Sequence, residues 1–388
     1  MIRTIAVEGY RSLRDLKLPL GQLNLITGAN GSGKSSVYRS LRLLADVAQN
    51  QVVASLAYEG GLPSTFWAGP ETIARSVRQG IHAPQGQAKQ KPASLKLGFG
   101  SDTYSYSVDL GYPPPGNTMF GLDPHIKREC VWHGPTYRKA SALVDRRNNI
   151  VWLSTTRDEE QVMLTQRLSY TDSMLATIAD PQRAPEMLAV REALRGWRFY
   201  DHFRADSESP TRTAQIGTFS PVLNHDGSNL AAALQTIIEI RPDDAVEKTI
   251  EDAFPGSRLS VQELNGRFEL QLRQHGLLRP LSAVELSDGT LRYLLWTAAL
   301  LTPRPPELMV LNEPETSLHP DLLPALARLI RAAANQTQII VVSHAQPLIG
   351  TLMEDPACTR LHLVKELGET TLYGSTLFNV PKWNWPTR

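Results

Sequence analysis

Residues 28–35 read Gly-Ala-Asn-Gly-Ser-Gly-Lys-Ser and fit the pattern G-x-x-x-x-G-K-[ST]. A strand pattern with apolar Leu23, Leu25 and Ile26 precedes them, and helical spacing of apolar residues follows from Val37, so the order is strand, glycine-rich loop and helix. In such a loop the backbone N–H groups curl around a phosphate, and the helix N-terminus adds a favourable dipole. We call residues 28–35 the phosphate loop. The alternative, a flexible glycine loop without a ligand, does not explain the strand and helix on either side.

The phosphate loop assigns a task to each of its polar residues. Lys34 is expected to reach the oxygens of the last two phosphates of a nucleotide, and Ser35 can offer its hydroxyl to Mg²⁺. The other expected phosphate contacts come from Asn30, Gly31, Ser32, Gly33 and Ser36.

Composition and charge narrow the class of protein. The chain has 388 residues and 41% hydrophobic content, enough for one large domain or two closely joined ones. The 40 Lys and Arg residues and 39 Asp and Glu residues give a formal charge of +1, which provides no overall attraction to nucleic acid or to an anionic membrane. Cys130 and Cys358 lack metal-binding or disulfide-type spacing, which favours a reducing, cytoplasmic setting. No stretch approaches the ~20 apolar residues that span a bilayer, so we expect no membrane partner.

Hydrophobic patterning outlines the other elements. Apolar runs and alternation predict strands at residues 2–27 (three strands), 95–99, 104–110, 308–311, 339–342, 361–364 and 371–373. Helical spacing predicts helices at residues 163–175, 185–194, 229–240 and 322–334.

The apolar run at residues 308–311 ends in Asn312 and Glu313. A strand with such a tip can deliver a metal-side residue and then a carboxylate to a bound phosphate. Glu313 is therefore the candidate general base for an attacking water. The alternative is a buried strand followed by a solvated acidic turn, and the phosphate loop disfavours it.

Two further motifs accompany this strand. Residues 286–290, Leu-Ser-Asp-Gly-Thr, precede a helical run, so Ser287 or Asp288 stands where a helix N-cap belongs. An ordinary helix cap is the alternative. Downstream, His344 follows the apolar run at residues 339–342, a place where a lone histidine is more often structural than catalytic.

Four features follow one another along the chain: the phosphate loop, residues 286–290, the strand that ends in Asn312 and Glu313, and His344. This order resembles that of ABC-type ATPases, and we call residues 286–290 the signature segment. Residues 9–13, Gly-Tyr-Arg-Ser-Leu, together with residues 25–28 resemble the SMC, RecF and OLD group. More narrowly, residues 196–201 and 312–320 resemble stand-alone bacterial predicted AAA-type ATPases related to RecF, an OLD-like ATPase domain without the nuclease domain. The resemblance implies an α/β P-loop NTPase fold: an ABC-type ATPase head with a mixed core sheet, an N-terminal antiparallel sheet and an inserted helical lobe.

The resemblance also implies ligands and residue roles. ATP and Mg²⁺ are the expected cofactors. Ser287 and Gly289 would bind the γ-phosphate of ATP held by the opposite subunit, so the working form would be an ATP-bound homodimer. His344 would be the switch histidine and act in catalysis with Glu313 and Lys34. Arg11 would lie near the nucleotide phosphates.

The chain departs from the family pattern at Asn312. The usual residue is an aspartate that holds Mg²⁺ through water, whereas an amide contributes no charge, so we expect weaker Mg²⁺ binding and slow turnover. Two glutamines, Gln166 and Gln235, remain open as Q-loop candidates. No long heptad segment lies between Ser35 and Ser287, so SMC-type coiled-coil arms are not expected.

We expect a single head, residues 1–388, with an N-terminal lobe at residues 1–155, a helical and irregular insert at 156–280 and a C-terminal lobe at 281–388. The leading hypothesis is a slow ATPase that acts on DNA or on a DNA-bound partner. The alternative is a nucleotide-gated binding module that controls a partner effector protein, with weak or no DNA binding. A transporter subunit is disfavoured by residues 9–13.

Overall fold

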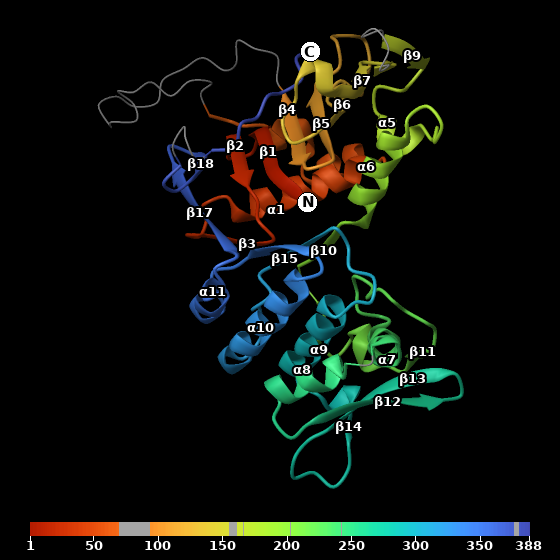
Figure 1. Cartoon of the computed structure of the whole chain (residues 1–388), viewed down its shortest axis with the longest axis vertical. Helices are drawn as coiled ribbons and strands as arrows, with labels where there is room; N and C mark the ends of the chain where they lie inside the picture. Colours follow the sequence, from red (N-terminus) through yellow and green to blue (C-terminus); the bar gives the residue numbers. More distant parts are fainter. Residues whose placement is uncertain (70–93, 155–160, 166, 202, 242, 376–379) are drawn as a thin grey trace. The chain divides into compact units, whose positions relative to one another are not determined.

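The chain folds into two units. The N-terminal residues with alternating polarity form strands, as predicted. The computed structural model describes residues 1–69, 94–154, 161–165, 167–201, 203–241, 243–375 and 380–388. Unit 1 comprises Met1–Gly21, Ile26–Trp197 and Leu361–Arg388, and unit 2 comprises Gln22–Leu25 and Arg198–Arg360. The elements of both units are labelled in Figure 1. The three lobes expected from the sequence stay a prediction.

Unit 1 contains an antiparallel sheet of eight strands in the order β2-β1-β4-β5-β6-β7-β8-β9. Its strands are β1 (Ile2–Tyr10), β2 (Leu13–Pro19), β4 (Leu95–Ser101), β5 (Tyr104–Gly111), β6 (His125–His133), β7 (Ala142–Arg147), β8 (Ile150–Ser154) and β9 (Gln161–Thr165). The predicted hairpin of β4 and β5 is confirmed, because Leu97 pairs with Val108 and Phe99 with Tyr106.

Helix α1 follows the phosphate loop and buries one face in unit 1. Its apolar residues Val37, Leu41 and Leu44 are buried, and the helix contacts β1 and β4 (Figure 1). The spacing of these residues therefore gave the correct helix face. Among the described residues, the helices of unit 1 are α1 (Lys34–Val47), α2 (Val52–Tyr58), α3 (Gly61–Thr65), α5 (Met174–Thr177) and α6 (Pro185–Gly196).

The helix predicted at residues 163–175 is wrong. Residues Gln161–Thr165 form β9 and pair with β8, and of the described residues in this segment only those from Met174 on, in α5 (Met174–Thr177), are helical. Val162 and Met163 are exposed, so their spacing does not mark a buried helix face. Pairing with the neighbouring strand, a tertiary contact, decides the structure here.

A fully buried ion pair joins three strands of unit 1 to the segment before α5. The Glu129 carboxylate accepts hydrogen bonds from Arg146 Nη1 at 2.7 Å, Tyr106 Oη at 2.6 Å, Ser173 Oγ at 2.5 Å and the Met174 N–H at 2.8 Å. Burial and then the nearby carboxylate raise the pKa of Tyr106 well above its ordinary value, so the phenol stays a donor. Four donors compensate the cost of burying this carboxylate.

We expect Glu129→Gln to lower the free energy of unfolding by about 3–5 kcal/mol, because the buried Arg146 guanidinium loses its counter-charge. Urea titration of both proteins measures the difference. Asp102→Asn is the matched control, since it breaks an exposed ion pair with Arg3 and should cost less than about 1 kcal/mol. An equal small loss in both variants would contradict the prediction.

Unit 2 contains parallel strands, as predicted for residues 308–311 and 339–342. Strands β10 (Arg198–Tyr200), β15 (Leu308–Asn312) and β16 (Gln338–Val342) pair in parallel, with Asn312 opposite Val342. In the part of unit 2 that the structure describes, the helices are α7 (Leu230–Ile240), α8 (Ala245–Ala253), α9 (Asp288–Leu300), α10 (Leu323–Ala334) and α11 (Gln346–Met353). Residues 290–300 of α9 are buried apart from Arg292, which makes α9 a core helix.

Strand β3 (Leu23–Gly28) belongs to both units. Its residues 23–25 lie in unit 2, and its residues 26–28 lie in unit 1. In the sheet, β3 neighbours β17 (Cys358–Glu366), whose residues from Leu361 on belong to unit 1 and pair with β18 (Glu369–Leu372). The predicted C-terminal hairpin is thus confirmed. The phosphate loop begins where β3 ends.

The segment at residues 156–280 is less helical than the sequence suggested. It includes an antiparallel hairpin, β12 (Arg258–Leu264) and β13 (Arg267–Arg273), and β13 also pairs with β11 (Gln215–Ile216) and β14 (Leu281–Ser282). The alternating residues of β12 are only partly buried on one face. None of the helices in the described ranges is long and apolar enough to cross a membrane.

Candidate functional site

The phosphate loop in unit 1 has a backbone that only glycine fits at residue 33. Gly33 is the N-cap of α1 with φ 105°, and a Cβ there would come within 2.2 Å of Thr370 Oγ1. Gly31 has φ 77°, and a Cβ at Gly31 would meet nothing within 4 Å. The loop therefore has a left-handed backbone beside open space.

Lys34 and Ser32 contribute buried polar atoms to this loop. The side chain of Lys34 is buried, and its Nζ donates to the carbonyl oxygens of Gly28 at 2.8 Å and Ala29 at 3.1 Å. The buried Ser32 Oγ has no hydrogen-bond partner among the described residues. A buried ammonium and an orphaned hydroxyl are suited to a ligand with many oxygen atoms.

The first turn of α1 is also suited to an anion. Among the described residues, no side chain caps this first turn, and the turn itself contains no acidic residue. Ser35 is exposed, and Ser36 is half-buried. The N–H groups of a first helical turn lack acceptors within the helix. Together with exposed Asn30, these residues fit the phosphates of a nucleotide.

Thr370 in β18 holds the phosphate loop from the side and was missed in the sequence. Its Oγ1 lies 2.9 Å from the Ser32 carbonyl oxygen and 2.8 Å from Ser12 Oγ, and its N–H donates to the Ser12 carbonyl at 2.8 Å. One hydroxyl thus links the phosphate loop to the turn after β1. A threonine in a short C-terminal strand carries no pattern that could have identified it.

Arg11 lies in that turn with φ 48° and makes an ion pair with Glu59. Its Nη2 is 2.8 Å from Glu59 Oε2, which also accepts a hydrogen bond from Tyr10 Oη at 2.5 Å. Burial lowers the pKa of Arg11, but the contacts with Glu59 outweigh this and raise it, so the guanidinium stays charged. Its expected place near a nucleotide stays a prediction.

In unit 2, the acidic residues follow the strand that the sequence predicted. Asn312 is the last residue of β15, and the Glu313 N–H donates to the Val342 carbonyl at 2.8 Å. Glu313 has φ 49°, and a residue other than glycine in this region costs about 1–3 kcal/mol. Its side chain is 42% exposed, so the carboxylate is accessible to water.

Glu315 fixes His344 and was not identified in the sequence. Glu315 Oε1 accepts hydrogen bonds from Ser343 Oγ at 2.7 Å and from the N–H groups of His344 and Ala345 at 3.0 and 3.2 Å. His344 Nδ1 lies 3.4 Å from Glu315 Oε1 and 3.8 Å from Glu313 Oε1. Glu313 and His344 are therefore brought together, with Glu315 as the link.

The signature segment begins α9, and its N-cap is confirmed as Ser287. Ser287 Oγ accepts from the Thr290 N–H at 3.2 Å, and Asp288 is the first helical residue. Arg292, one turn further, donates to the Thr316 carbonyl at 3.2 Å, which joins α9 to the turn after Glu313. A Cβ at Gly289 would be 3.5 Å from the Ser317 carbonyl oxygen, an ordinary contact.

Neither Q-loop candidate gains support. Gln166 lies outside the described residues. Gln235 Nε2 donates to Glu239 Oε1 at 2.7 Å on the same helix. In the described parts of the chain, no cluster of three or more His, Cys, Asp or Glu residues could hold a metal ion.

Two family models match the chain. A model described as "AAA domain, putative AbiEii toxin, Type IV TA system" matches residues 147–349, more than half of the chain. A model described as "AAA ATPase domain" matches residues 1–177.

Two known proteins are similar in sequence to parts of this chain. An OLD nuclease of Thermus scotoductus is 24% identical over 263 residues, which are 62% of this chain and 49% of that protein. An uncharacterized protein of Methanocaldococcus jannaschii is 48% identical over 44 residues, 11% of this chain and 20% of that protein. The chain thus spans about half the length of the first relative and about a fifth of the second.

A crystal structure of an SMC head bound to the C-winged helix domain of ScpA aligns with 97% of this chain and 98% of its own, with a TM-score of 0.50 and 13% identity. At this identity the likeness concerns the fold. The predicted α/β P-loop NTPase fold is therefore confirmed.

Proposed function

This chain belongs to the AAA domain family that matches residues 147–349, and from that premise we propose that it binds ATP between two copies of itself and hydrolyses it slowly. It is an OLD-like and SMC-like AAA ATPase domain. The proposal adds the ATP-bound dimer, the residue roles and the slow rate.

The observation that carries the proposal is the set of hydrogen bonds that the Lys34 ammonium makes. Its buried ammonium is hydrogen-bonded only to two loop carbonyls among the described residues, Gly28 and Ala29. Phosphate oxygens carry more charge than carbonyl oxygens and form stronger hydrogen bonds with an ammonium. ATP would therefore draw Lys34 from these carbonyls to its β- and γ-phosphates.

Mg²⁺ would be held mainly by the nucleotide and by Ser35. The hydroxyl of Ser35 is exposed at the start of α1, as an ion next to bound phosphates requires. Asn312 would accept a hydrogen bond from a metal-bound water without adding negative charge. Bound Mg²⁺ would neutralise charge on the phosphates, and its weaker retention at Asn312 would make turnover slow.

Glu313 would act as the general base. Its exposed carboxylate can accept a proton from water, and its left-handed backbone holds it at the end of β15. His344, 3.8 Å from Glu313, would contact the γ-phosphate. Ser287 and Gly289 would bind the γ-phosphate of ATP held by the second copy, which explains why ATP would favour the dimer.

We consider two targets for this ATPase: DNA or a DNA-bound partner, and a partner effector protein. Action on DNA or on a DNA-bound partner follows from the RecF-like resemblance. Control of a partner protein is favoured by Asn312, because slow hydrolysis would prolong the ATP-bound state in which a partner binds. ATP turnover measured with and without duplex DNA separates them, because only the first predicts stimulation by DNA.

Glu313→Gln tests the proposed function. We expect ATP to remain bound while hydrolysis falls by about 100-fold or more, because an amide cannot accept the proton of the attacking water. The ATP-bound dimer should then accumulate and be visible by light scattering, with phosphate release measured in parallel.

Glu307→Gln is the matched control, since Glu307 is an exposed carboxylate just before β15, at the end opposite Glu313. This variant should hydrolyse ATP like the unmodified protein. Unchanged turnover in Glu313→Gln would exclude Glu313 as the base. A monomer that persists in Glu313→Gln at saturating ATP would contradict the dimer.

A further inference from the structure

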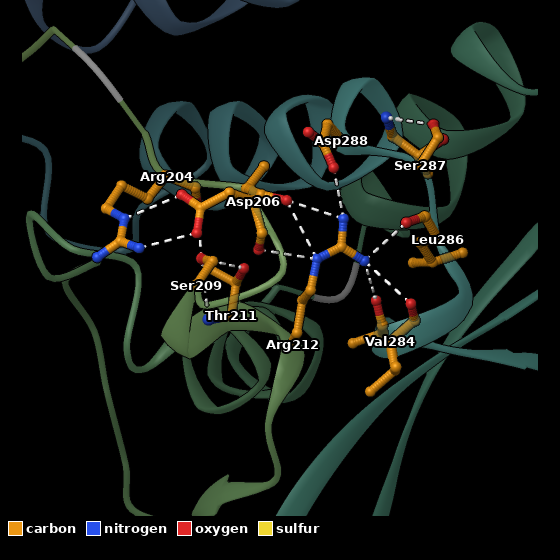
Figure 2. Close-up of polar contacts among 12 residues, drawn as sticks. Arg204, Asp206, Ser209, Thr211, Arg212, Val284, Leu286, Ser287 and Asp288 are labelled. Carbon is orange, nitrogen blue, oxygen red and sulfur yellow. Dashed lines mark hydrogen bonds and ion pairs between the residues drawn. The ribbon is translucent and has the colours of Figure 1, made fainter.

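Arg212 is a nearly buried cation that contacts the signature segment. It is the last residue of a short 3-10 turn, Pro210–Arg212, and its side chain is 10% exposed. Figure 2 shows its guanidinium between the backbone of its own loop and the residues that lead into α9. All of these residues belong to unit 2.

One terminal nitrogen of Arg212 donates hydrogen bonds to three backbone carbonyl oxygens that precede Ser287. Its Nη1 lies 3.1 Å from the carbonyl oxygens of Ala283 and Val284 and 2.8 Å from that of Leu286 (Figure 2). Leu286 immediately precedes the N-cap. A planar guanidinium therefore sets the direction in which the chain enters α9, and a lysine could not supply the same fork of donors.

The other terminal nitrogen of Arg212 holds an acidic side chain. Its Nη2 is 2.6 Å from Asp288 Oδ1, and Asp288 is 57% exposed next to Ser287 (Figure 2). A free carboxylate at this place would repel a phosphate that approaches Ser287. The ion pair keeps the carboxylate directed to Arg212 and offsets its charge.

Arg212 itself is held by its loop. Nε donates to the carbonyl oxygens of Ala205 at 3.1 Å and Asp206 at 3.0 Å. Ser209 Oγ donates to the Arg204 carbonyl at 2.7 Å and accepts from the Thr211 N–H at 3.3 Å (Figure 2). These contacts fix the guanidinium before any ligand arrives.

We infer that Arg212 is a positioning residue of the signature segment: it fixes the backbone that presents Ser287, and it neutralises Asp288 so that this segment accepts a phosphate. The inference rests on the proposed function, in which Ser287 binds the γ-phosphate of ATP held by the second copy. Arg212 acts through residues 283–288 and has no part in ATP binding by the phosphate loop.

The test uses the full chain with Glu313→Gln, in which ATP-driven dimers accumulate. Adding Arg212→Ala should raise the ATP concentration for half-maximal dimerisation by about tenfold or more, because the carbonyls lose charge-assisted hydrogen bonds and Asp288 loses its counter-charge. The affinity of the phosphate loop for ATP, titrated at protein concentrations too low for dimers, should stay unchanged. Light scattering and equilibrium titration give the two values.

Two further variants separate the role of charge from a general loss of structure. Arg212→Lys should give an intermediate shift, since it keeps the charge and loses the fork. Arg212→Ala with Asp288→Asn should recover part of the loss, because the uncompensated carboxylate is removed, and damage to the fold would not be repaired in this way. Arg204→Ala is the control, as Arg204 pairs with Asp206 in the same loop and should shift nothing.

The outcomes distinguish this inference from the proposed function. If the Glu313→Gln protein itself fails to dimerise with ATP, the proposed function fails first. If it dimerises and Arg212→Ala does so at the same ATP concentration, the role of Arg212 is wrong. If Arg212→Ala loses dimerisation and Asp288→Asn recovers none of it, the neutralisation of Asp288 is wrong.

Discussion

Lys34→Ala will abolish tight ATP binding, with an increase in Kd of at least about 100-fold. The buried ammonium of Lys34 is the cation of the phosphate loop, and its loss leaves the β- and γ-phosphates without their strongest donor. Equilibrium titration with a fluorescent ATP analogue measures the change. A melting temperature recorded for each variant separates loss of binding from loss of fold.

Lys96→Ala is the matched control for Lys34→Ala. Lys96 lies in β4 of the same unit, and its Nζ makes an ion pair with Glu8 at 2.8 Å. Removing it deletes a lysine without touching the phosphate loop, so ATP affinity should stay the same. Normal affinity in Lys34→Ala would contradict the assignment of the loop.

Elements with a strong local pattern could be predicted from the sequence. The first three strands, the β4–β5 hairpin and the strand, helix and strand from Leu308 to Val342 were found because apolar residues there repeat with one period and end at turns. Strand β9 was not found, because its structure depends on β8. Strands β12 and β13 were missed although a local signal exists, because Phe268, Leu270 and Leu272 alternate with polar residues after the turn Asn265-Gly266.

The residues of the candidate site also form two groups: some could be identified from local motifs, and others only from the fold. Lys34, Glu313 and Ser287 stand in short motifs, where the order of residues carries the chemical task. Glu315 and Arg212 act through contacts with residues distant in the sequence: Glu315 meets Ser343 and His344, and Arg212 meets residues 283–288. Such contacts need the fold, because no local spacing distinguishes these side chains from an acidic turn or an exposed arginine.

The proposed sharing of the ATP site between two copies can be tested with two defective variants. Ser287→Arg should prevent ATP-driven dimerisation, because a bulky side chain would fill the place of the γ-phosphate, while ATP binding to the phosphate loop of the monomer stays nearly unchanged. Lys34→Ala should fail for the opposite reason, since its phosphate loop is defective and its signature segment is intact. Each variant alone should lose nearly all ATPase activity.

Mixing the two variants should restore part of this activity. In a mixed dimer, one of the two sites combines the intact phosphate loop of Ser287→Arg with the intact signature segment of Lys34→Ala. Neither variant forms an ATP-bound dimer with itself, so ATP should favour mixed dimers. Each mixed dimer has one complete site out of two, so recovery should reach about half of the wild-type rate at most. Phosphate release at equal total protein measures it. If Ser287→Arg alone hydrolyses ATP at the wild-type rate as a monomer, the signature segment is only a helix cap, and hydrolysis needs no second copy.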